Sequence, residues 1–516
     1  MQFERHNARE GLAQAIESLR AAPTCLWDSC RFAIKPTLIL WLIFTVGISA
    51  IILANFNYSD DMARVALGFK KWDHFSRYTT TFLSSFMHAG NYLTDISPLT
   101  QMVATFELAI AGVIALYVIS GRRQLNIWLV VAILPLGLCP YFLECLSYKY
   151  DSPYMALSVL ASIAPLLLMR RNRIVFALAV IAGELIVCTT YQAASGILPL
   201  LVMVIALRRW CADEDTKEIL RFLLLSACAY LAALLIFKLF LMQPAENYVS
   251  TEIPSIGELP GIFIGHLDMY MKYMMSDFKK IWLILIALVV IAFIWVTIRD
   301  TERNRMLTFI LTIVCLALMS CLTFGIYPAL EQPLFQPRAM YGVGAFIAFL
   351  AIVVASSPRI LCGKLVILAL SWCFLVFSFT YGNALYAQIQ WTNFRTTSAI
   401  QDLNDTPEFA TETPKIVQVK GGIGLSPILR NQPQNYKMLK RLIPIAFQGG
   451  EQWGLVGFTY YYGLPNVKVE SATTFDESLS PFKGYRLPGN LRRWRELPRR
   501  AEVACPATPP APRPSR

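Results

Sequence analysis

Long apolar segments separated by short polar stretches dominate the chain between residues 36 and 382. A helix needs about 20 apolar residues to cross the hydrocarbon of a bilayer, so segments of that length are candidate membrane spans. Read with a window of about 19 residues, the pattern predicts a polytopic α-helical membrane protein with about 11 transmembrane helices. The predicted spans are residues 36–56, 98–119, 125–146, 152–169, 174–190, 193–207, 219–241, 281–298, 306–326, 339–355 and 364–382.

The polar stretches between these spans fall into two sets with different contents of Lys and Arg. One set holds 14 of these residues in 43 positions, whereas the loops on the opposite side hold 9 in 99. Basic short loops stay in the cytoplasm, so we expect the first set to be cytoplasmic. With an odd number of spans, the N-terminal segment 1–35 is then cytoplasmic, and loop 57–97 and the chain from residue 383 lie on the outer face. The first set consists of residues 120–126, 169–174, 208–221, 299–305 and 356–364.

Within loop 57–97 the apolar residues return at helical spacing. Phe82, Leu83, Phe86 and Met87 are interleaved with polar residues at the period of an α-helix. This pattern is typical of an amphipathic helix lying in the membrane surface. Such a helix could form one wall of a site for a lipid headgroup.

Beyond the last span the composition changes to Thr, Pro, Gln and Asn with aromatic clusters. Residues 415–419 and 467–469 have the pattern of short strands, and we expect a small α+β domain over residues 383–490 on the outer face. Residues 491–516 are rich in Arg and Pro, which predicts a disordered tail. The transmembrane module itself is expected to occupy residues 36–382.

Composition agrees with a membrane protein and excludes several functions. The 516 residues are 56% hydrophobic and only 16% charged, with a mean hydropathy of +0.49, which is too apolar for a soluble protein of this length. The net charge of +12 is spread over short loops and a C-terminal tail, so we expect no nucleic-acid partner. The sequence contains no CxxC, HExxH, GxxxxGK[ST] or GxSxG, the usual signals for zinc, nucleotide and serine-hydrolase sites.

Two adjacent acids, Asp60 and Asp61, follow the first predicted span directly and are followed by Arg64. They therefore stand where water, a lipid headgroup and a soluble reactant can meet. Adjacent residues of a helix point in different directions, so we expect one acid to face a reacting atom and the other to hold Arg64 or a helix N-terminus. Simple capping of a membrane helix is the alternative explanation of this pair.

Further ionisable residues gather at span ends on the same face, which favours a site over simple capping. Asp95 and Asp151 each precede a Ser/Pro helix start and are the strongest candidates for structural caps. Acids within spans usually face a protein interior or a cavity. The residues of this group are Asp95, Lys149, Asp151, Glu331 and Arg338, with Glu107, Glu144 and Glu184 inside spans and Tyr191-Gln192 close to Glu184.

Several short strings in this order resemble the bacterial serotype-converting O-antigen glucosyltransferases. The opening of that family is similar to residues 58–64 with Gly68-Phe69 and Trp72, and then to residues 95–101. Later landmarks resemble residues 148–153 and Tyr191-Gln192. The likeness by motif covers roughly the first 210 residues. One departure is that Phe75-Ser76-Arg77 stands where the family has a glycine-arginine dipeptide.

The resemblance implies a GT-C-type enzyme in the bacterial inner membrane, with its active site facing the periplasm. Such an enzyme transfers glucose from polyprenyl-phosphate-glucose to O-antigen of lipopolysaccharide, with inversion, and an acid after the first span is its base. Here that acid would be Asp60 or Asp61. The cations available for the donor phosphate are Arg64, Lys149, Arg338 and Arg77, and the supporting residues are Asp95, Asp151, Glu184, Tyr191, Gln192 and Glu331.

Other readings remain open at this point. A divalent cation held by Asp60 or Asp61 and a phosphate is compatible with the sequence, which contains no complete metal site of its own. Trp453, Tyr460 and Tyr461 could stack on acceptor sugars, with packing in a domain core as the alternative. A transporter or flippase of polyprenyl-linked sugars, or a GT-C enzyme that uses another sugar, would share many of these features.

Overall fold

The structure is a computed structural model of the whole chain. It describes residues 32–122, 126–243, 252–255, 257–405, 415–420, 422–430, 432–447, 462–464, 467–471 and 500–504. The predictions for Trp453, Tyr460 and Tyr461, and for nearly all of segment 1–35, lie outside these residues.

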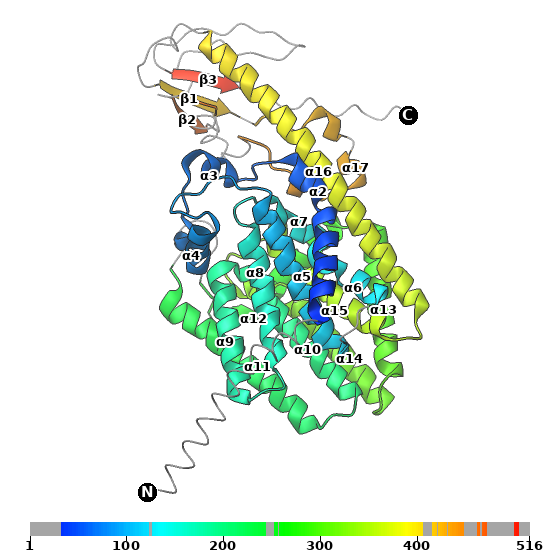
Figure 1. The fold of residues 1–516 in the computed structure, drawn as a ribbon. Coiled ribbons are helices and arrows are strands. Elements are labelled where there is room, and N and C mark those ends of the chain that lie inside the picture. Colours follow the sequence, from blue (N-terminus) through cyan, green and yellow to red (C-terminus); the bar gives the residue numbers. More distant parts are fainter. Residues whose placement is uncertain are drawn as a thin grey trace, which may run out of the picture.

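The described part is mostly helical (Figure 1). After a first helix over Phe32–Gly47, the chain order is Ser49–Ala54 (α2), Asp61–Leu67 (α3), Trp72–Phe75 (η1), Tyr78–Met87 (α4), Leu99–Ser120 (α5), Ile127–Leu138 (α6), Pro140–Ser147 (α7), Ser152–Ile163 (α8), Ala164–Leu168 (η2), Arg173–Thr190 (α9), Gln192–Gly196 (η3), Ile197–Cys211 (α10), Thr216–Ile236 (α11), Phe237–Leu241 (η4), Leu259–Asp277 (α12), Lys280–Arg299 (α13), Arg305–Leu322 (α14), Tyr327–Ala329 (η5), Pro337–Ala339 (η6), Gly342–Ser356 (α15) and Leu361–Asn404 (α16). Short elements follow at Lys415–Lys420 (β1), Pro427–Arg430 (η8), Gln432–Asn435 (α17), Leu439–Leu442 (α18), Val467–Ser471 (β2) and Arg500–Ala504 (β3).

The helices confirm a polytopic helical membrane protein. Within the described residues, 7 helices are long and apolar enough to cross a membrane, or 8 if the bent pair α6 and α7 is one span. Three shorter apolar helices, Phe32–Gly47, Ser152–Leu168 and Gly342–Ser356, coincide with the first, fourth and tenth predicted spans. Each predicted span thus coincides with helical structure over most of its length, while a total of eleven spans stays a prediction.

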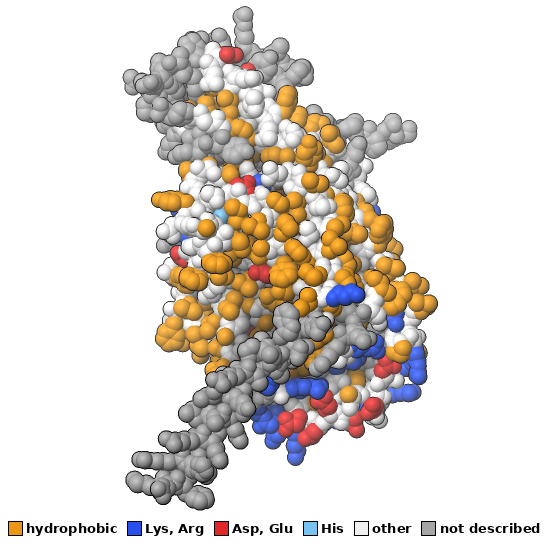
Figure 2. Space-filling model, in the orientation of Figure 1, with side chains coloured by type: hydrophobic (Ala, Val, Ile, Leu, Met, Phe, Trp, Pro, Cys, Tyr) orange, Lys and Arg blue, Asp and Glu red, His pale blue; other side chains and the backbone are white. Residues whose placement is uncertain are grey.

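Exposed side chains support the same conclusion. Figure 2 shows a broad belt of hydrophobic side chains across the helical body, with Lys, Arg, Asp and Glu gathered at the end of the body farthest from the strands. Leu224, Ile284 and Trp372 are among the large apolar side chains exposed on these helices. An apolar surface of this extent is unfavourable in water and favourable against lipid.

The break between α6 and α7 gives the chain a 58° bend inside a predicted span. Pro140 occupies the first position of α7, where its missing N–H costs nothing, and Cys139 before it has an extended ψ of 133°. Because of this bend, α7 leads into the loop Tyr148–Asp151, which reaches the candidate site.

Two helices extend beyond what hydropathy predicts. Helix α12 lies within the predicted loop 242–280. Helix α16 is 44 residues long and ends at Asn404, whereas its predicted span ends at residue 382. Both segments contain many polar residues, so a hydropathy window does not detect them, although such residues form helices readily. Figure 1 shows α16 running out of the helical body towards the strands.

Helix α2 is held against α16 by a close approach of the two backbones. A Cβ added at Gly382 would lie 2.4 Å from the carbonyl carbon of Ala50, so only glycine fits there without a shift. One turn earlier, Ser378 Oγ donates to Gly47 O at 2.7 Å. These contacts fix the end of the first predicted span and therefore the starting point of the loop that contains Asp60.

The C-terminal strands form a parallel sheet in the order β2-β1-β3. The strands predicted at residues 415–419 and 467–469 are confirmed as β1 and β2. Strand β3 falls inside segment 491–516, where residues 500–504 pair with β1, and the disorder expected for this segment stays a prediction. Strand β3 pairs with β1, which is distant in the sequence, so the local composition of segment 491–516 cannot reveal this strand. A separate domain over residues 383–490 stays a prediction.

Candidate active site

A tight turn after α2 brings the two acids to the start of α3. Asn55 and Ser59 both have a φ of 46°, in the left-handed region, and these residues turn the chain after the helix. Asp61 N then donates to Tyr58 O at 3.0 Å, which starts α3 with Asp60 at its N-cap position. The two neighbouring carboxylates consequently enter different surroundings.

Asp61 is fully buried and accepts hydrogen bonds from the backbone of two loops. Its Oδ2 accepts from Tyr58 N at 3.2 Å and from Lys149 N at 2.8 Å. Burial raises the pKa of Asp61 to about 8, against the opposing effect of the Arg64 charge. Asp61 therefore joins the first loop to the loop before α8 and is mainly protonated at neutral pH.

Asp60 is the accessible acid of the pair, with 34% of its side chain exposed. Its Oδ2 lies 3.6 Å from Arg64 Nη2. Burial is the largest influence and raises the pKa of Asp60 above its ordinary value; Asp151 adds to this, while Arg64, Arg338 and Arg77 lower it. Asp60 therefore combines access to solvent with three guanidinium groups near enough to influence its charge.

Arg64 is buried between an acid and an aromatic ring. It forms an ion pair with Asp151, and its guanidinium carbon lies 4.5 Å from the centre of the Trp72 ring. Trp72 Nε1 in turn donates to Asp151 Oδ1 at 2.5 Å. Asp151 occupies the N-cap position of α8 but makes no side-chain cap bond, so its prediction as a helix cap was wrong. Its oxygens bind Arg64 and Trp72 instead.

Lys149 links two loops through its side chain. Its Nζ donates to Asn57 Oδ1 at 2.8 Å and to Asp95 Oδ2 at 2.9 Å. Asp95 also accepts from the N and Oγ of Ser97, and these bonds lower the pKa of Asp95 despite its partial burial. Helix α5 begins only at Leu99, so Asp95 closes a turn and does not cap the helix as predicted.

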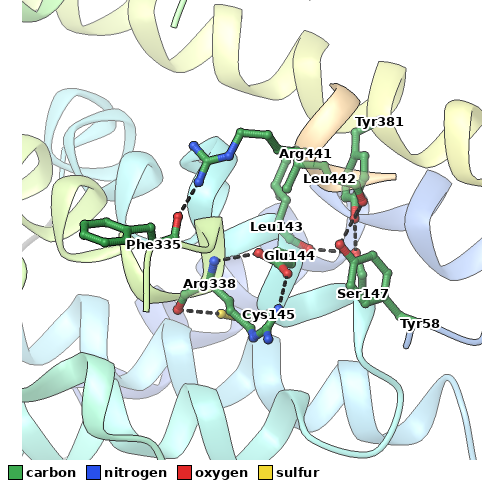
Figure 3. A network of polar contacts seen from close by, with 10 residues as sticks. All are labelled: Tyr58, Leu143, Glu144, Cys145, Ser147, Phe335, Arg338, Tyr381, Arg441 and Leu442. Atoms are coloured by element: carbon green, nitrogen blue, oxygen red, sulfur yellow. Dashed lines mark hydrogen bonds and ion pairs between the residues drawn. The ribbon is translucent and has the colours of Figure 1, made fainter. Parts of the chain in front are cut away.

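Arg338 approaches from η6 and is clasped by Glu144 of α7 (Figure 3). Glu144 Oε2 accepts from Arg338 N at 2.6 Å, and Glu144 Oε1 lies 2.7 Å from Arg338 Nη1. The guanidinium carbon is 5.6 Å from the centre of the Tyr148 ring. The acid predicted to face the protein interior at position 144 thus fixes a cation of the site.

Arg77, Tyr191 and Gln192 meet on a neighbouring side. The Arg77 guanidinium carbon lies 4.7 Å from the centre of the Tyr191 ring, and Gln192 Nε2 donates to Phe75 O at 3.3 Å and to Cys188 O at 2.8 Å. Next to them is a cavity of about 170 Å³. Its lining is mostly apolar and includes Arg77, Lys238, Leu234, Phe237, Ile326 and Leu330.

Two predicted supporting residues lie apart from this cluster. Glu184 is fully buried in α9, and neither of its carboxylate oxygens has a hydrogen-bond partner among the described residues. Glu331 is exposed, and its backbone N donates to Glu252 O at 3.1 Å. No contact described for either residue connects it with Asp60.

A comparison with protein families decides the class of this protein. A model of the family "Glucosyl transferase GtrII" matches residues 49–349, which is more than half of the chain and contains all the charged residues just described. The chain belongs to the GtrII family of glucosyl transferases. No curated protein and no solved structure matches it. The resemblance drawn from the sequence is therefore confirmed, and a GtrII protein is a glycosyltransferase associated with a membrane.

The described residues of this GtrII protein contain no group of three or more His, Cys, Asp or Glu side chains that could hold a metal ion. One Asp61 oxygen is engaged by two backbone N–H groups, and Asp60 is the accessible carboxylate. A divalent cation would thus depend on Asp60 and on the substrate phosphate for most of its charged ligands.

Sequence reasoning missed the roles of three residues. Trp72 entered only as part of the resemblance, yet it holds both Arg64 and Asp151. Asn57 was not singled out and accepts from Lys149. Glu144 gave a signal, because an acid inside an apolar span needs a partner, but that partner is 194 positions away.

Proposed function

We propose that this glucosyl transferase moves glucose from a polyprenyl-phosphate-glucose donor to O-antigen or a related lipopolysaccharide acceptor at the periplasmic face of the bacterial inner membrane. Asp60 is the general base. The observation that supports this assignment most strongly is that Asp60, the accessible member of the acid pair, has its Oδ2 3.6 Å from Arg64 Nη2, while the charges of Arg64, Arg338 and Arg77 lower its pKa against the effect of burial.

Asp60 suits the role of base better than Asp61. A base must offer an unprotonated oxygen to the acceptor hydroxyl. Asp61 has a pKa of about 8, is fully buried and already accepts two backbone hydrogen bonds. The side chain of Asp60 is not engaged by two backbone N–H groups as that of Asp61 is, and three guanidinium groups favour its ionised form.

The reaction balances with these groups alone. The acceptor oxygen attacks the anomeric carbon of glucose and transfers its proton to Asp60, while the bond from that carbon to the phosphate oxygen breaks with its electron pair. Polyprenyl phosphate leaves as an anion and needs no proton from an acid, so cations suffice on that side. A single displacement inverts the anomeric centre.

The arginines divide into two groups for this reaction. Arg64 is buried against Asp151 and Trp72, so its main part is to hold α3 and set the charge around Asp60. Arg338 and Arg77 come from separate loops and are the better phosphate partners, because a guanidinium offers two parallel N–H bonds to phosphate oxygens. Lys149 is engaged by Asp95 and Asn57 and is the weaker candidate.

The cavity beside Arg77 is the proposed place for the lipid end of the donor. Its lining is apolar around two cations, Arg77 and Lys238, which matches an isoprenoid chain ending in a phosphate. Leu239 and Phe240, which follow Lys238, are both exposed, as expected of residues that face lipid. The role of Trp453, Tyr460 and Tyr461 at the acceptor remains an expectation.

The test uses purified protein in liposomes with synthetic polyprenyl-phosphate-glucose and an O-antigen acceptor, with product measured by mass. Asp60→Asn is expected to lower kcat by at least about 100-fold, since a general base contributes about 10² to 10⁴. Asp61→Asn keeps an oxygen that can accept both backbone bonds, and we expect most of the activity to remain.

Lipid-phosphate-mannose in the same assay tests the choice of sugar. The proposal fails if Asp60→Asn transfers glucose at a near wild-type rate, or if lipid-phosphate-glucose gives no product with the wild-type enzyme.

A further inference from the structure

Helix α18 lies outside the region that matches the family, yet it contacts the loop that contains the proposed base. The carbonyl oxygen of Leu442 accepts from Tyr58 Oη at 2.8 Å and lies 3.3 Å from Tyr381 Oη (Figure 3). Tyr58 stands two residues before Asp60, and its backbone N donates to Asp61. Leu442 itself is fully buried. The end of α18 is thus fixed directly behind the turn that presents Asp60.

The preceding residue, Arg441, contacts the other half of the site. Its guanidinium binds Asp277 through Nη1. Its Nη2 donates to the carbonyl oxygen of Phe335 (Figure 3). Phe335 stands three residues before Arg338. Asp277 is buried and also accepts from Tyr141 Oη at 3.1 Å, so the anchor for Arg441 is well defined.

From these contacts we propose that Arg441 and Leu442 set the relative position of Asp60 and Arg338, with Arg441 as a positioning residue for glucosyl transfer. The inference rests on the proposed function of the Asp60 site. Two consecutive residues of the C-terminal segment thereby connect the loop of the base with the loop of a phosphate partner.

The geometry of Arg441 demands a guanidinium. One planar group donates in two directions, to a carboxylate of α12 and to a backbone carbonyl of the segment before η6. Its carbon also lies 4.3 Å from the centre of the Tyr273 ring. A lysine keeps the charge at Asp277 but has no second, rigidly placed N–H for Phe335 O. Arg441→Lys therefore releases the segment before Arg338 while an ion pair remains available.

Arg441→Lys is the test variant, and Lys440→Ala, at the exposed neighbouring position, is the matched control. We expect Arg441→Lys to lower kcat by about 10- to 100-fold, because a shift of about 1 Å in a catalytic group has effects of that size. KM for the lipid donor should change less than kcat. Lys440→Ala should behave as the wild type.

The pH dependence of kcat gives a readout that loss of folded protein would not move. Asp60 is influenced by Arg64 of α3, Asp151 before α8, Arg338 of η6 and Arg77 before α4. Arg338 lowers the pKa of Asp60, so moving Arg338 away raises that pKa. The acidic limb of the profile should shift to higher pH in Arg441→Lys and stay unchanged in Lys440→Ala.

Hydrogen exchange measured by mass spectrometry tests the positioning without reference to activity. Amides of residues 57–61 and 335–341 should exchange faster in Arg441→Lys than in Lys440→Ala. Tyr58→Phe, which removes the hydroxyl bound to Leu442 O, should increase exchange in residues 57–61.

Unchanged exchange in both segments would overturn the inference. So would a fall in kcat that matches the loss of folded protein, with no shift of the pH profile. If instead Asp60→Asn stays active, the proposed function fails, while the exchange experiment still decides whether α18 orders the two loops.

Discussion

At the residue scale, two adjacent aspartates have very different surroundings. Asp61 turns into the protein and binds backbone N–H groups, whereas Asp60 remains accessible beside Arg64. The sequence predicted that the two acids would point in different directions, because neighbouring helical residues do. It could not tell which one is buried, since the loop around Lys149 that receives Asp61 is 88 positions away.

The same limit explains the two errors about Asp95 and Asp151. Both precede a helix, which is the usual setting of a cap. Arg64 and Trp72 reach Asp151 from 87 and 79 positions away, and a buried arginine is a stronger partner for a carboxylate than a helix N-terminus. Local sequence contains the capping signal but not the competing partner.

The buried proton on Asp61 predicts a pH effect on stability. The folded protein holds this proton up to about pH 8, whereas the group's ordinary pKa is 3.8, so the unfolded chain releases it earlier. Stability from this group is therefore fully present below about pH 4 and is lost as the pH rises to about 8. Asp61→Asn cannot ionise and should not show this loss.

Thermal unfolding in detergent between pH 5 and pH 8 checks this effect. As the pH rises, the Tm of the wild type should fall relative to the Tm of Asp61→Asn. A difference that is independent of pH would show that Asp61 is ionised in the folded protein throughout this range.

At the element scale, hydropathy located the apolar helices but not the elements that shape the site. Every predicted span coincides with an apolar helix, because the apolar composition of each segment is by itself enough to favour a helix in lipid. Helix α12 and the polar half of α16 are stabilised by their neighbours instead: Tyr270 of α12 stacks on Phe324, and Gln388 of α16 accepts from Ser426 N at 2.9 Å. Their positions therefore depend on contacts across the chain.

The contact of α2 with α16 predicts a strong effect of one methyl group. Gly382→Ala places a Cβ against the backbone of Ala50, which has to move, and overpacking of this kind costs about 1–3 kcal/mol. Because α2 leads into the turn with Asp60, transfer should fall as well. The matched control is Gly265→Ala in α12, where nothing lies within 4 Å of the added atom.

Unfolding temperature and initial transfer rate of the two alanine variants check this prediction. Gly265→Ala should equal or exceed the wild type in stability, since alanine favours a helix. Equal behaviour of both variants would mean that α2 does not pack closely on α16.

At the scale of the whole molecule, the apolar belt and the charged end define how the chain would sit in a membrane (Figure 2). Lys217, Arg299 and Arg359 lie in loops predicted to be cytoplasmic, whereas the Asp60 cluster follows the first predicted span on the other side. We propose that the site opens on the non-cytoplasmic surface, where a prenyl-linked sugar and a glycan acceptor can meet.

Labelling of single cysteines with a membrane-impermeant maleimide shows on which side of the membrane the site lies. In intact cells, on a background without native cysteines, the probe Asn91→Cys lies in the exposed part of loop 57–97, and Lys217→Cys is the exposed control for the opposite side. We predict that Asn91→Cys is labelled in intact cells and that Lys217→Cys is labelled only after the cells are opened. Labelling in the reverse order would put Asp60 in the cytoplasm and contradict the proposed enzyme.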